Sequence, residues 1–310
     1  MSYVLGVNLP EALCREETLI SWLGFFKSIG ISSLEISPCC FNIIRGCHLD
    51  HKALQALLDI LSPFGFKYTL HAPNEVNLAE PTLHRYSLRI LRECLEMALR
   101  LGTRLVVMHT GYILPPKSVL QQVYWSGVKN VTYREPCVEL KEQALRLLIK
   151  GLRALHKDLE DYGVILALEN GDLGITHLCR RVEEIERVIR ETRSDYVKMT
   201  LDLAHLYISS KALDFDFLAS VRRAIPMVVH IHLSDNYGVY HPAFPDHNLV
   251  YGFGDLHLPI GWGNIPFGKV FEIVRSYYKG VLLIEVDPTY GRRGYIDSVK
   301  ALRKLIEGSR

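Results

Sequence analysis

The sequence predicts an α/β protein built as a single-domain (β/α)8 TIM barrel over residues 1–310. Three observations support this prediction. Eight short runs rich in β-branched and other apolar residues alternate with eight segments of helical periodicity. The runs are almost continuously apolar, which is typical of strands buried on both faces of a parallel sheet. About 250 residues suffice for such a barrel, so roughly 60 residues are left for its loops.

Turn residues bound each expected strand. In chain order, the expected strands cover residues 3–7, 33–36, 67–70, 105–108, 164–168, 197–201, 228–233 and 281–284. The expected helices cover residues 16–28, 51–61, 82–101, 138–161, 177–191, 215–224, 267–278 and 295–307. In the fourth of these helices, Leu140, Ala144, Leu147, Leu148 and Leu155 recur at helical spacing, which indicates one apolar face turned toward the barrel.

Two long loops account for most of the other residues. They cover residues 111–137 after the fourth strand and 235–266 after the seventh, and both are rich in Pro, Gly and aromatic residues. Both follow the carboxyl ends of strands, where barrels of this kind build their sites.

An open, doubly wound sheet is the alternative fold, because its strands and helices would alternate along the chain in the same way. However, no GxGxxG follows the first strand and no GxxxxGK[ST] occurs, which disfavours nucleotide binding.

The composition excludes several classes of protein. Hydrophobic residues make up 48% of the chain, and 36 Lys and Arg against 34 Asp and Glu leave a net charge of +2. Disordered, collagen-like and membrane-spanning chains are therefore excluded, and the small net charge gives no general electrostatic attraction to nucleic acid or a membrane surface.

The N-terminal residues lack the pattern of a signal peptide, so we expect a cytoplasmic protein. Seven cysteines without a CxxC pair argue against a disulfide framework, and we expect Cys39 and Cys40 to pack in the core or a loop.

Charged or imidazole side chains end seven of the eight expected strands. They are Glu35, His71, His109, Glu169, Asp202, His232 and Glu285. Strand ends in a barrel form a ring around one mouth, so these distant residues are expected to become neighbours. Burying so many unpaired charges is costly, and cations are the simplest compensation. Carboxylates and imidazoles without thiolates suit Zn, Mn, Co or Fe(II).

Further polar residues extend this pattern. His205 stands three residues after Asp202, and Asp255 and His257 lie two apart on the long seventh loop, so all three are candidate ligands. His230 precedes His232 by two residues and shares its side of the strand. We interpret Glu35, His230 and Asp235 as residues that support the ligands or contact the substrate; for His230 a core histidine is the alternative.

Taken together, these motifs resemble the xylose isomerase-like superfamily of metal-dependent TIM barrels, also called AP endonuclease family 2. This superfamily contains endonuclease IV and many sugar or sugar-phosphate isomerases and epimerases. The resemblance rests on LEIS, HAPNEVNLA, HTG, LEN, LDLAH, HLSDN, DLH, GWGNIPF and IEV, which span nearly the whole chain.

The resemblance implies two ligand patterns. Endonuclease IV holds three zinc ions, which map here to three groups: His71, His109 and Glu169; Glu169, Asp202, His232 and Glu285; and His205, Asp255 and His257. The isomerases and epimerases typically hold one Mn, Co or Mg ion through the second group, with the residue like His205 touching substrate hydroxyls. We therefore expect one to three divalent ions per chain.

Two enzymatic hypotheses follow. In the first, the protein is a divalent-metal-dependent sugar or sugar-phosphate isomerase or epimerase, which moves a proton through a metal-stabilised enediolate with Glu169 and Glu285 as acid and base. In the alternative, an endonuclease IV-like zinc phosphodiesterase cleaves DNA at abasic sites, and Glu169 bridges two ions. The loop at 72–81 is not basic and has no aromatic wedge for bending a duplex, which favours the first hypothesis.

The expected partner is a small sugar or sugar phosphate, and DNA only under the alternative. The resembling isomerases are often dimers or tetramers, so a homo-oligomer is a further expectation. A third hypothesis is a non-catalytic barrel in which metal serves only as a structural staple.

Overall fold

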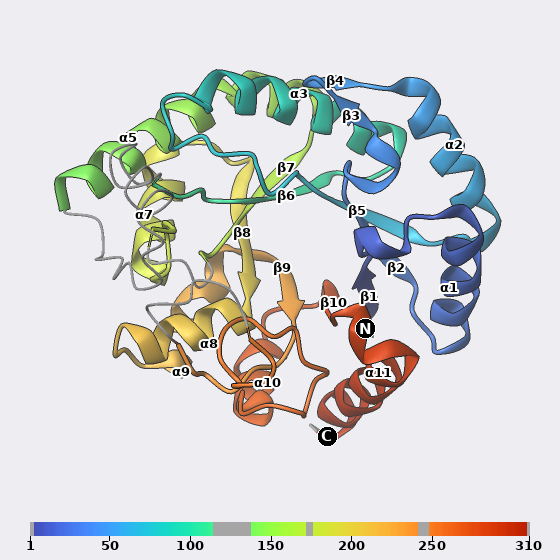
Figure 1. The fold of residues 1–310 in the computed structure, drawn as a ribbon. Coiled ribbons are helices and arrows are strands. Elements are labelled where there is room, and N and C mark those ends of the chain that lie inside the picture. Colours follow the sequence, from blue (N-terminus) through green and yellow to red (C-terminus); the bar gives the residue numbers. More distant parts are fainter. Residues whose placement is uncertain (1–2, 114–137, 172–175, 241–247, 309–310) are drawn as a thin grey trace, which may run out of the picture.

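Eight parallel strands form the centre of the computed structural model, which describes residues 3–113, 138–171, 176–240 and 248–308. They are β1 (Val4–Asn8), β2 (Ser33–Ile36), β5 (Lys67–His71), β6 (Leu105–His109), β7 (Ile165–Glu169), β8 (Val197–Asp202), β9 (Val228–Leu233) and β10 (Val281–Ile284). The strands close into a barrel in the order β1-β10-β9-β8-β7-β6-β5-β2 (Figure 1). The predicted (β/α)8 barrel is confirmed.

Helices surround the barrel in Figure 1. They are α1 (Glu16–Ser28), α2 (His51–Leu61), α3 (His84–Arg100), α5 (Val138–Ala154), α6 (His156–Tyr162), α7 (Val182–Thr192), α8 (Leu203–Ala212), α9 (Phe217–Ala224), α10 (Phe267–Val274) and α11 (Gly291–Glu307). Within the described ranges, none of the helices combines the length and the apolar character needed to span a membrane.

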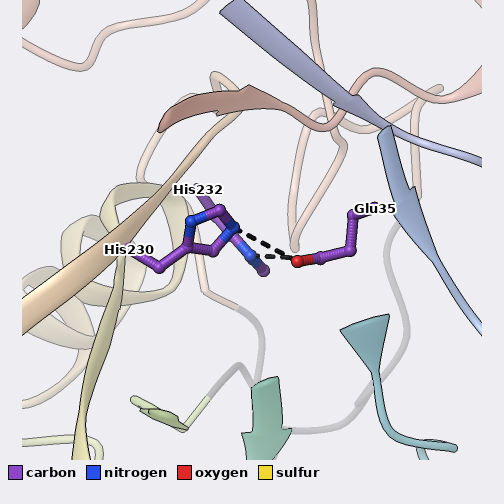
Figure 2. A group of neighbouring side chains, drawn as sticks. All are labelled: Glu35, His230 and His232. Atoms are coloured by element: carbon purple, nitrogen blue, oxygen red, sulfur yellow. Dashed lines mark hydrogen bonds and ion pairs between the residues drawn. The ribbon is translucent and has the colours of Figure 1, made fainter. Parts of the chain in front are cut away.

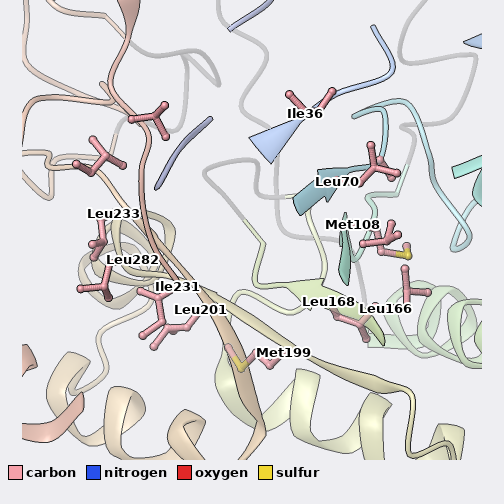
Figure 3. Close-up of a cluster of buried hydrophobic side chains, with 14 of the residues drawn as sticks. Ile36, Leu70, Met108, Leu166, Leu168, Met199, Leu201, Ile231, Leu233 and Leu282 are labelled. Carbon is pink, nitrogen blue, oxygen red and sulfur yellow. The ribbon is translucent and has the colours of Figure 1, made fainter. Parts of the chain in front are cut away.

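An apolar layer between the strands and the helices determines which residues face the barrel interior. Successive side chains of a strand point to opposite faces. In β9, Ile231 and Leu233 belong to the apolar layer (Figure 3). His230 and His232, which alternate with them along the strand, therefore point into the barrel. In β7, Leu168 lies in the same layer and Glu169 faces inward. A one-residue slip would place charged groups in this layer, so packing fixes the register that brings them to the mouth.

Several helix predictions need correction, and one helix was not predicted. The helix expected at 267–278 ends at Val274, and the helix expected at 295–307 begins at Gly291. The helix expected at 177–191 begins only at Val182, because His177 forms a β-bridge with Tyr112 instead. The helix expected at 138–161 is interrupted at Leu155 between α5 and α6. Helix α8 was not predicted, because every residue from Leu203 to Ser210 is buried and the segment therefore shows no amphipathic pattern.

The loops contain elements that the sequence analysis did not predict. A short hairpin of β3 (Ile44–Arg45) and β4 (His48–Leu49) follows β2. Of the two long loops, residues 114–137 and 241–247 lie outside the described ranges.

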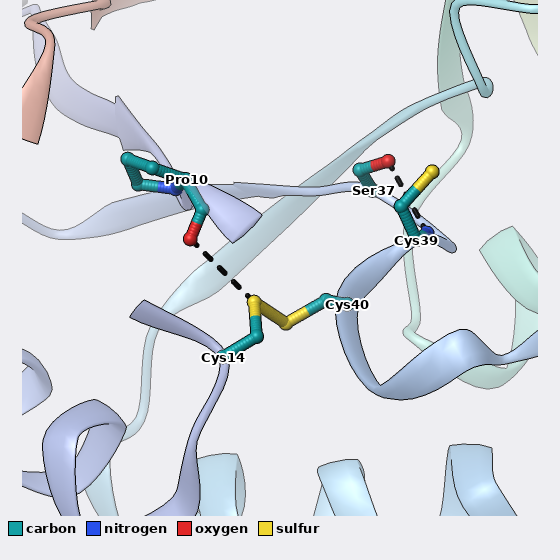
Figure 4. Close-up of a disulfide and its surroundings, with 5 residues drawn as sticks. All are labelled: Pro10, Cys14, Ser37, Cys39 and Cys40. Carbon is teal, nitrogen blue, oxygen red and sulfur yellow. Dashed lines mark hydrogen bonds between the residues drawn. A yellow bond between two sulfur atoms is a disulfide. The ribbon is translucent and has the colours of Figure 1, made fainter. Parts of the chain in front are cut away.

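One disulfide joins Cys14, which follows β1, to Cys40, which follows β2 (Figure 4). The odd cysteine count and the absence of CxxC pairs argued against a disulfide framework, so the bond between Cys14 and Cys40 runs against that expectation. Cys40 is buried in the core, as expected, whereas Cys39 is a half-buried free thiol. The bond therefore ties together the two segments that continue from neighbouring strands toward the mouth of the barrel.

Candidate metal centre

Four side chains meet at the carboxyl ends of four consecutive strands. They are Glu169, Asp202, His232 and Glu285, which we call the tetrad, and one donor atom of each lies within 4.8 Å of the others. Strand pairing brings them together: Asp202 pairs with His232, and the backbone N–H of Glu285 donates to the Leu233 carbonyl at 2.9 Å. All four side chains are buried.

A second group shares Glu169 with the tetrad. Its members, His71, His109 and Glu169, also offer three donor atoms within 4.8 Å of one another, and we call them the outer group. Glu169 Oε2 lies 3.1 Å from His71 Nε2 and 3.8 Å from His109 Nε2. Glu169 Oε1 instead lies 3.2 Å from His232 Nδ1 in the tetrad. The two oxygens of Glu169 therefore face two different groups of candidate ligands.

The third sequence-predicted group centres on Asp255. Its Oδ2 atom lies 3.2 Å from His205 Nε2 and 2.9 Å from His257 Nε2. These three residues contact each other in pairs, but they are not among the groups whose donor atoms all lie within 4.8 Å. His205 also approaches the tetrad, with Nδ1 3.5 Å from Glu169 Oε1. The structure therefore brings His205, Asp255 and His257 next to the tetrad, in a less compact arrangement than the other two groups.

Three histidines share one orientation that is typical of metal ligands. The Nδ1 atoms of His71, His205 and His257 lie 2.7, 3.1 and 3.2 Å from the backbone carbonyls of Ala72, Asn170 and Glu285. Donation to a carbonyl places the proton on Nδ1 and leaves Nε2 as an acceptor. In each case Nε2 faces a carboxylate oxygen, so two acceptors meet unless a proton or a cation lies between them.

Glu35 supports the tetrad from inside the barrel. Thr69 Oγ1 donates to its Oε2 atom at 2.9 Å, and His230 Nε2 lies 3.2 Å from the same oxygen. His232 Nε2 lies 3.2 Å from Glu35 Oε1 (Figure 2), and its Nδ1 lies 3.3 Å from Glu285 Oε1, so the imidazole is held between Glu35 on one side and the tetrad carboxylates on the other. Glu35 and His230 thus lie on the side of His232 away from the tetrad carboxylates, and their supporting role stays a prediction.

The electrostatics of the site fit a bound cation. Burial raises the pKa of Asp202 to about 7, and the negative charges of Glu169 and Glu285 add to this effect against the attraction of His205. The Oδ2 atom of Asp202 is buried and has no hydrogen-bond partner within the described part of the chain. Burial disfavours a charged His71, but the hydrogen bond to Glu169 and its charge outweigh burial and raise the pKa of His71 to about 9. A divalent ion would satisfy the carboxylates and displace these protons, and the donor set of carboxylates and imidazoles suits one.

The predicted site residue Asp235 organises the loop above the mouth. Its carboxylate accepts hydrogen bonds from four backbone N–H groups, at distances of 2.9 to 3.1 Å. These donors belong to Asn236, Gly261, Gly263 and Ile265. A Cβ atom on Gly263 would lie 2.4 Å from the Asn236 carbonyl, so this close approach requires glycine. Asp235 therefore acts on the loop rather than on the candidate ligands.

A cavity of about 290 Å³ opens above these groups. Glu169, Glu285 and His205, the three predicted catalytic residues, all line it. Its rim comes from the segments after β1 and β2, including Glu11 and Cys39. A small molecule in the cavity would therefore contact the proposed acid and base directly.

A model of the family described as xylose isomerase-like TIM barrel matches residues 24–305. The chain belongs to this family. Two proteins of Methanocaldococcus jannaschii, both named as uncharacterized, are relatives. MJ1311 is 25% identical over 275 residues, covering 86% of this chain and 79% of its own. MJ1614 is 27% identical over 215 residues, covering 68% and 67%.

Solved structures with the xylose isomerase-like fold cover almost the entire chain. A D-tagatose 3-epimerase-like protein superposes with a TM-score of 0.70 at 22% identity, covering 98% of this chain and 97% of its own. A D-psicose 3-epimerase solved in the presence of D-fructose gives 0.66 at 13%, covering 97% of each. A family member from Mycobacterium smegmatis in complex with magnesium gives 0.69 at 13%, covering 98% and 96%.

Asn170, which the sequence analysis did not single out, holds the ends of two neighbouring strands together. Asn170 Nδ2 donates to the Asp202 carbonyl at 3.0 Å, and the Asp202 N–H donates to Asn170 Oδ1 at 2.9 Å. This pair of bonds joins the ends of β7 and β8 and so positions Glu169 beside Asp202. The position of Asn170 directly after Glu169, in the LEN motif, was the available signal.

Proposed function

We propose that this protein is a divalent-metal-dependent sugar isomerase or epimerase. The observation that carries the proposal is the position of Glu169 and Glu285, two carboxylates of the tetrad that both line the cavity. They come from β7 and from the end of β10, which are separated in the barrel by β8 and β9. They can therefore approach a bound sugar from different sides, as proton transfer on opposite faces requires.

The charge states of these carboxylates suit the proposed reaction. For both, burial is outweighed by neighbouring histidines, first among them His232, which hold the pKa of each carboxyl below its usual range. Each can therefore accept a proton from the carbon next to a carbonyl, and the protonated partner can return one. A divalent ion at the tetrad would polarise that carbonyl and stabilise the enediolate. His205, which lines the same cavity, would contact the sugar hydroxyls.

The names of similar solved proteins support a sugar as the substrate. The D-tagatose 3-epimerase-like protein and the D-psicose 3-epimerase suggest a ketose, and the similar protein solved in complex with magnesium supports the choice of a divalent cation. We propose Mn, Co, Mg or Zn at the tetrad, and a free sugar or sugar phosphate as the partner. A cytoplasmic location and a homo-oligomer stay predictions.

Hydrogen exchange tests the proposal most directly. We would incubate the metal-loaded protein with D-fructose, D-tagatose, D-psicose and ketose phosphates in D2O and follow the products by NMR. Epimerisation places deuterium at the inverted carbon, and isomerisation places it next to the new carbonyl. Glu285→Gln should abolish exchange at saturating metal, whereas Glu96→Gln on the outer helix α3 should not. Absence of exchange with every sugar would contradict the proposal.

The outer group supports a second candidate, an endonuclease IV-like phosphodiesterase. The sharing of Glu169 between two groups of donors would suit a bridged pair of ions, and Asp255 with its two histidines offers donors for a third. In this case His71→Ala should abolish cleavage of a duplex that carries an abasic site. An isomerase that uses the tetrad alone should keep its activity in the same variant.

A further inference from the structure

A second cavity of about 260 Å³ adjoins the one above the tetrad. Asn74 and His109 line both cavities, so His109 stands between the candidate metal centre and the second cavity. The first cavity alone, at about 290 Å³, lies near the lower end of the range of roughly 300–1,000 Å³ that ligand pockets span. A ligand that filled both would be larger than one held above the tetrad only.

Two hydrogen-bonded segments frame the second cavity. Ile113 N–H donates to the Thr176 carbonyl at 2.9 Å, and Leu178 N–H donates to the Gly111 carbonyl at the same distance. Thr110 Oγ1 also donates to the Leu178 carbonyl at 2.9 Å. The segments after β6 and β7 thus pair in a short antiparallel ladder, and the cavity has a defined wall.

The close approach of these segments depends on glycine. A Cβ atom on Gly171 would lie 2.2 Å from the Leu178 carbonyl, and one on Gly111, where φ is +92°, would lie 2.3 Å from Asn77 Oδ1. Both glycines line the second cavity. A larger residue at Gly171 would push the two segments apart, and one at Gly111 would collide with the side chain of Asn77, so the sequence is adapted to this wall.

The lining of the second cavity is aromatic and polar. Tyr112 and His177 meet edge to face with ring centroids 5.5 Å apart, and the Asn74 amide and the Thr110 hydroxyl lie around them. Among the described residues that line this cavity, none is Lys, Arg, Asp or Glu. Aromatic rings offer a surface for the apolar C–H face of a sugar, and neutral polar groups bond its hydroxyls. A phosphate would call for cationic partners instead.

We propose that the second cavity binds the second ring of a disaccharide or glycoside whose reacting ketose lies over Glu169. This inference rests on the proposed function, because it assumes that the first cavity holds a sugar. His109 and Asn74 would contact the linkage between the two rings, and Tyr112 would pack against the second ring.

Equilibrium binding to the metal-loaded protein tests the proposal. The probes are D-fructose, its 4-O-glucosyl and 6-O-glucosyl disaccharides maltulose and isomaltulose, and D-fructose 6-phosphate, each measured by calorimetry. The variant Tyr112→Leu keeps apolar bulk but removes the ring, and Tyr112→Phe keeps the ring. Tyr86→Leu, on the exposed face of α3, is the matched control.

We expect at least one disaccharide to bind about tenfold more tightly than D-fructose, which corresponds to roughly 1.4 kcal/mol. Tyr112→Leu should remove this gain and leave D-fructose binding within about twofold, and Tyr112→Phe should restore it. The proposal is overturned if neither disaccharide binds more tightly than D-fructose, or if Tyr112→Leu weakens all probes equally. A gain for the phosphate that depends on Tyr112 would overturn the assignment to a sugar ring.

Turnover separates this inference from the proposed function. If D-fructose is converted but neither disaccharide gains affinity, the second-ring site fails and the isomerase or epimerase stands. If a disaccharide binds through Tyr112 but no sugar exchanges hydrogen, the proposed reaction fails and the binding site stands.

Discussion

Replacing Glu35 by glutamine would test how the tetrad is held. The change keeps the shape of the side chain but turns one carboxylate oxygen into an amide that donates. His232 Nε2 lies 3.2 Å from Glu35 Oε1, and neither atom has another hydrogen-bond partner among the described residues, so the imidazole proton belongs on Nε2. If the new amide faced His232, the proton would move to Nδ1, which lies 3.2 and 3.3 Å from the carboxylates of Glu169 and Glu285 and would then be unable to bind metal.

The opposite orientation of the amide is also unfavourable. It would face His230 Nε2, and the proton of His230 would move to Nδ1, which is buried and has no partner in the ranges that the structure describes. A buried, unsatisfied donor costs about 1–3 kcal/mol. Changes to residues that orient metal ligands typically lower metal affinity about 10–100-fold. This loss corresponds to about 1.4–2.7 kcal/mol of binding free energy, which lies within the range of the cost of the unsatisfied donor. We therefore expect Glu35→Gln to weaken metal binding by about 10–100-fold.

Metal titration against a competing chelator measures this effect. Thr69→Val is the control, because it removes one hydroxyl donor from the same carboxylate and leaves the contact with His232 in place. It should change metal affinity by less than about threefold. Circular dichroism would verify that both variants are folded. Equal affinity of Glu35→Gln and the wild type, or equal loss in both variants, would refute this account of the tetrad.

Three further predictions concern the loops and the effect of pH. Asp235→Asn replaces a carboxylate that accepts four backbone hydrogen bonds, so it should lower the free energy of unfolding by about 2–3 kcal/mol in urea titrations and leave metal affinity unchanged. Cys14→Ser removes the disulfide to Cys40 and should cost about 2–4 kcal/mol in thermal unfolding; melting together with the wild type would show that the bond does not stabilise the fold. Raised pKa values of about 9 for His71 and about 10 for His257 stabilise the metal-free protein below pH 6.5, and this contribution is lost as the pH rises through those values. The melting temperature without metal should therefore fall over this interval. The increment from metal bound at the tetrad should grow, because the ion neutralises the charges of Glu169 and Glu285 that favour these protons; an increment independent of pH would contradict metal binding at these carboxylates.

The sequence was sufficient to predict the barrel and the residues at its mouth, for a specific physical reason. Strands buried on both faces are continuously apolar, so a charged residue at their end, such as Glu169 or His232, stands out against its surroundings. Closure of the barrel then brings these ends together without any local motif. The family resemblance added the grouping of the ligands, which strand-end positions alone do not determine.

Three features could not be predicted, because they depend on contacts between segments that are far apart in the sequence. Helix α8 is buried on all sides, so its sequence has no amphipathic period, and Asp202 caps its first turn while also belonging to the tetrad. The disulfide between Cys14 and Cys40 depends on how the segments after β1 and β2 fold over the mouth. The wall around Tyr112 and His177 likewise forms from two loops far apart in the chain.

Metal stoichiometry tests the central claim most directly. Elemental mass spectrometry and titration of the stripped protein would count the divalent ions bound per chain in the wild type, Asp202→Asn and His71→Ala. The account predicts one tightly bound ion in the wild type, its loss in Asp202→Asn, and its retention in His71→Ala. A protein that takes up no divalent ion, or that binds one equally well in Asp202→Asn, would contradict it.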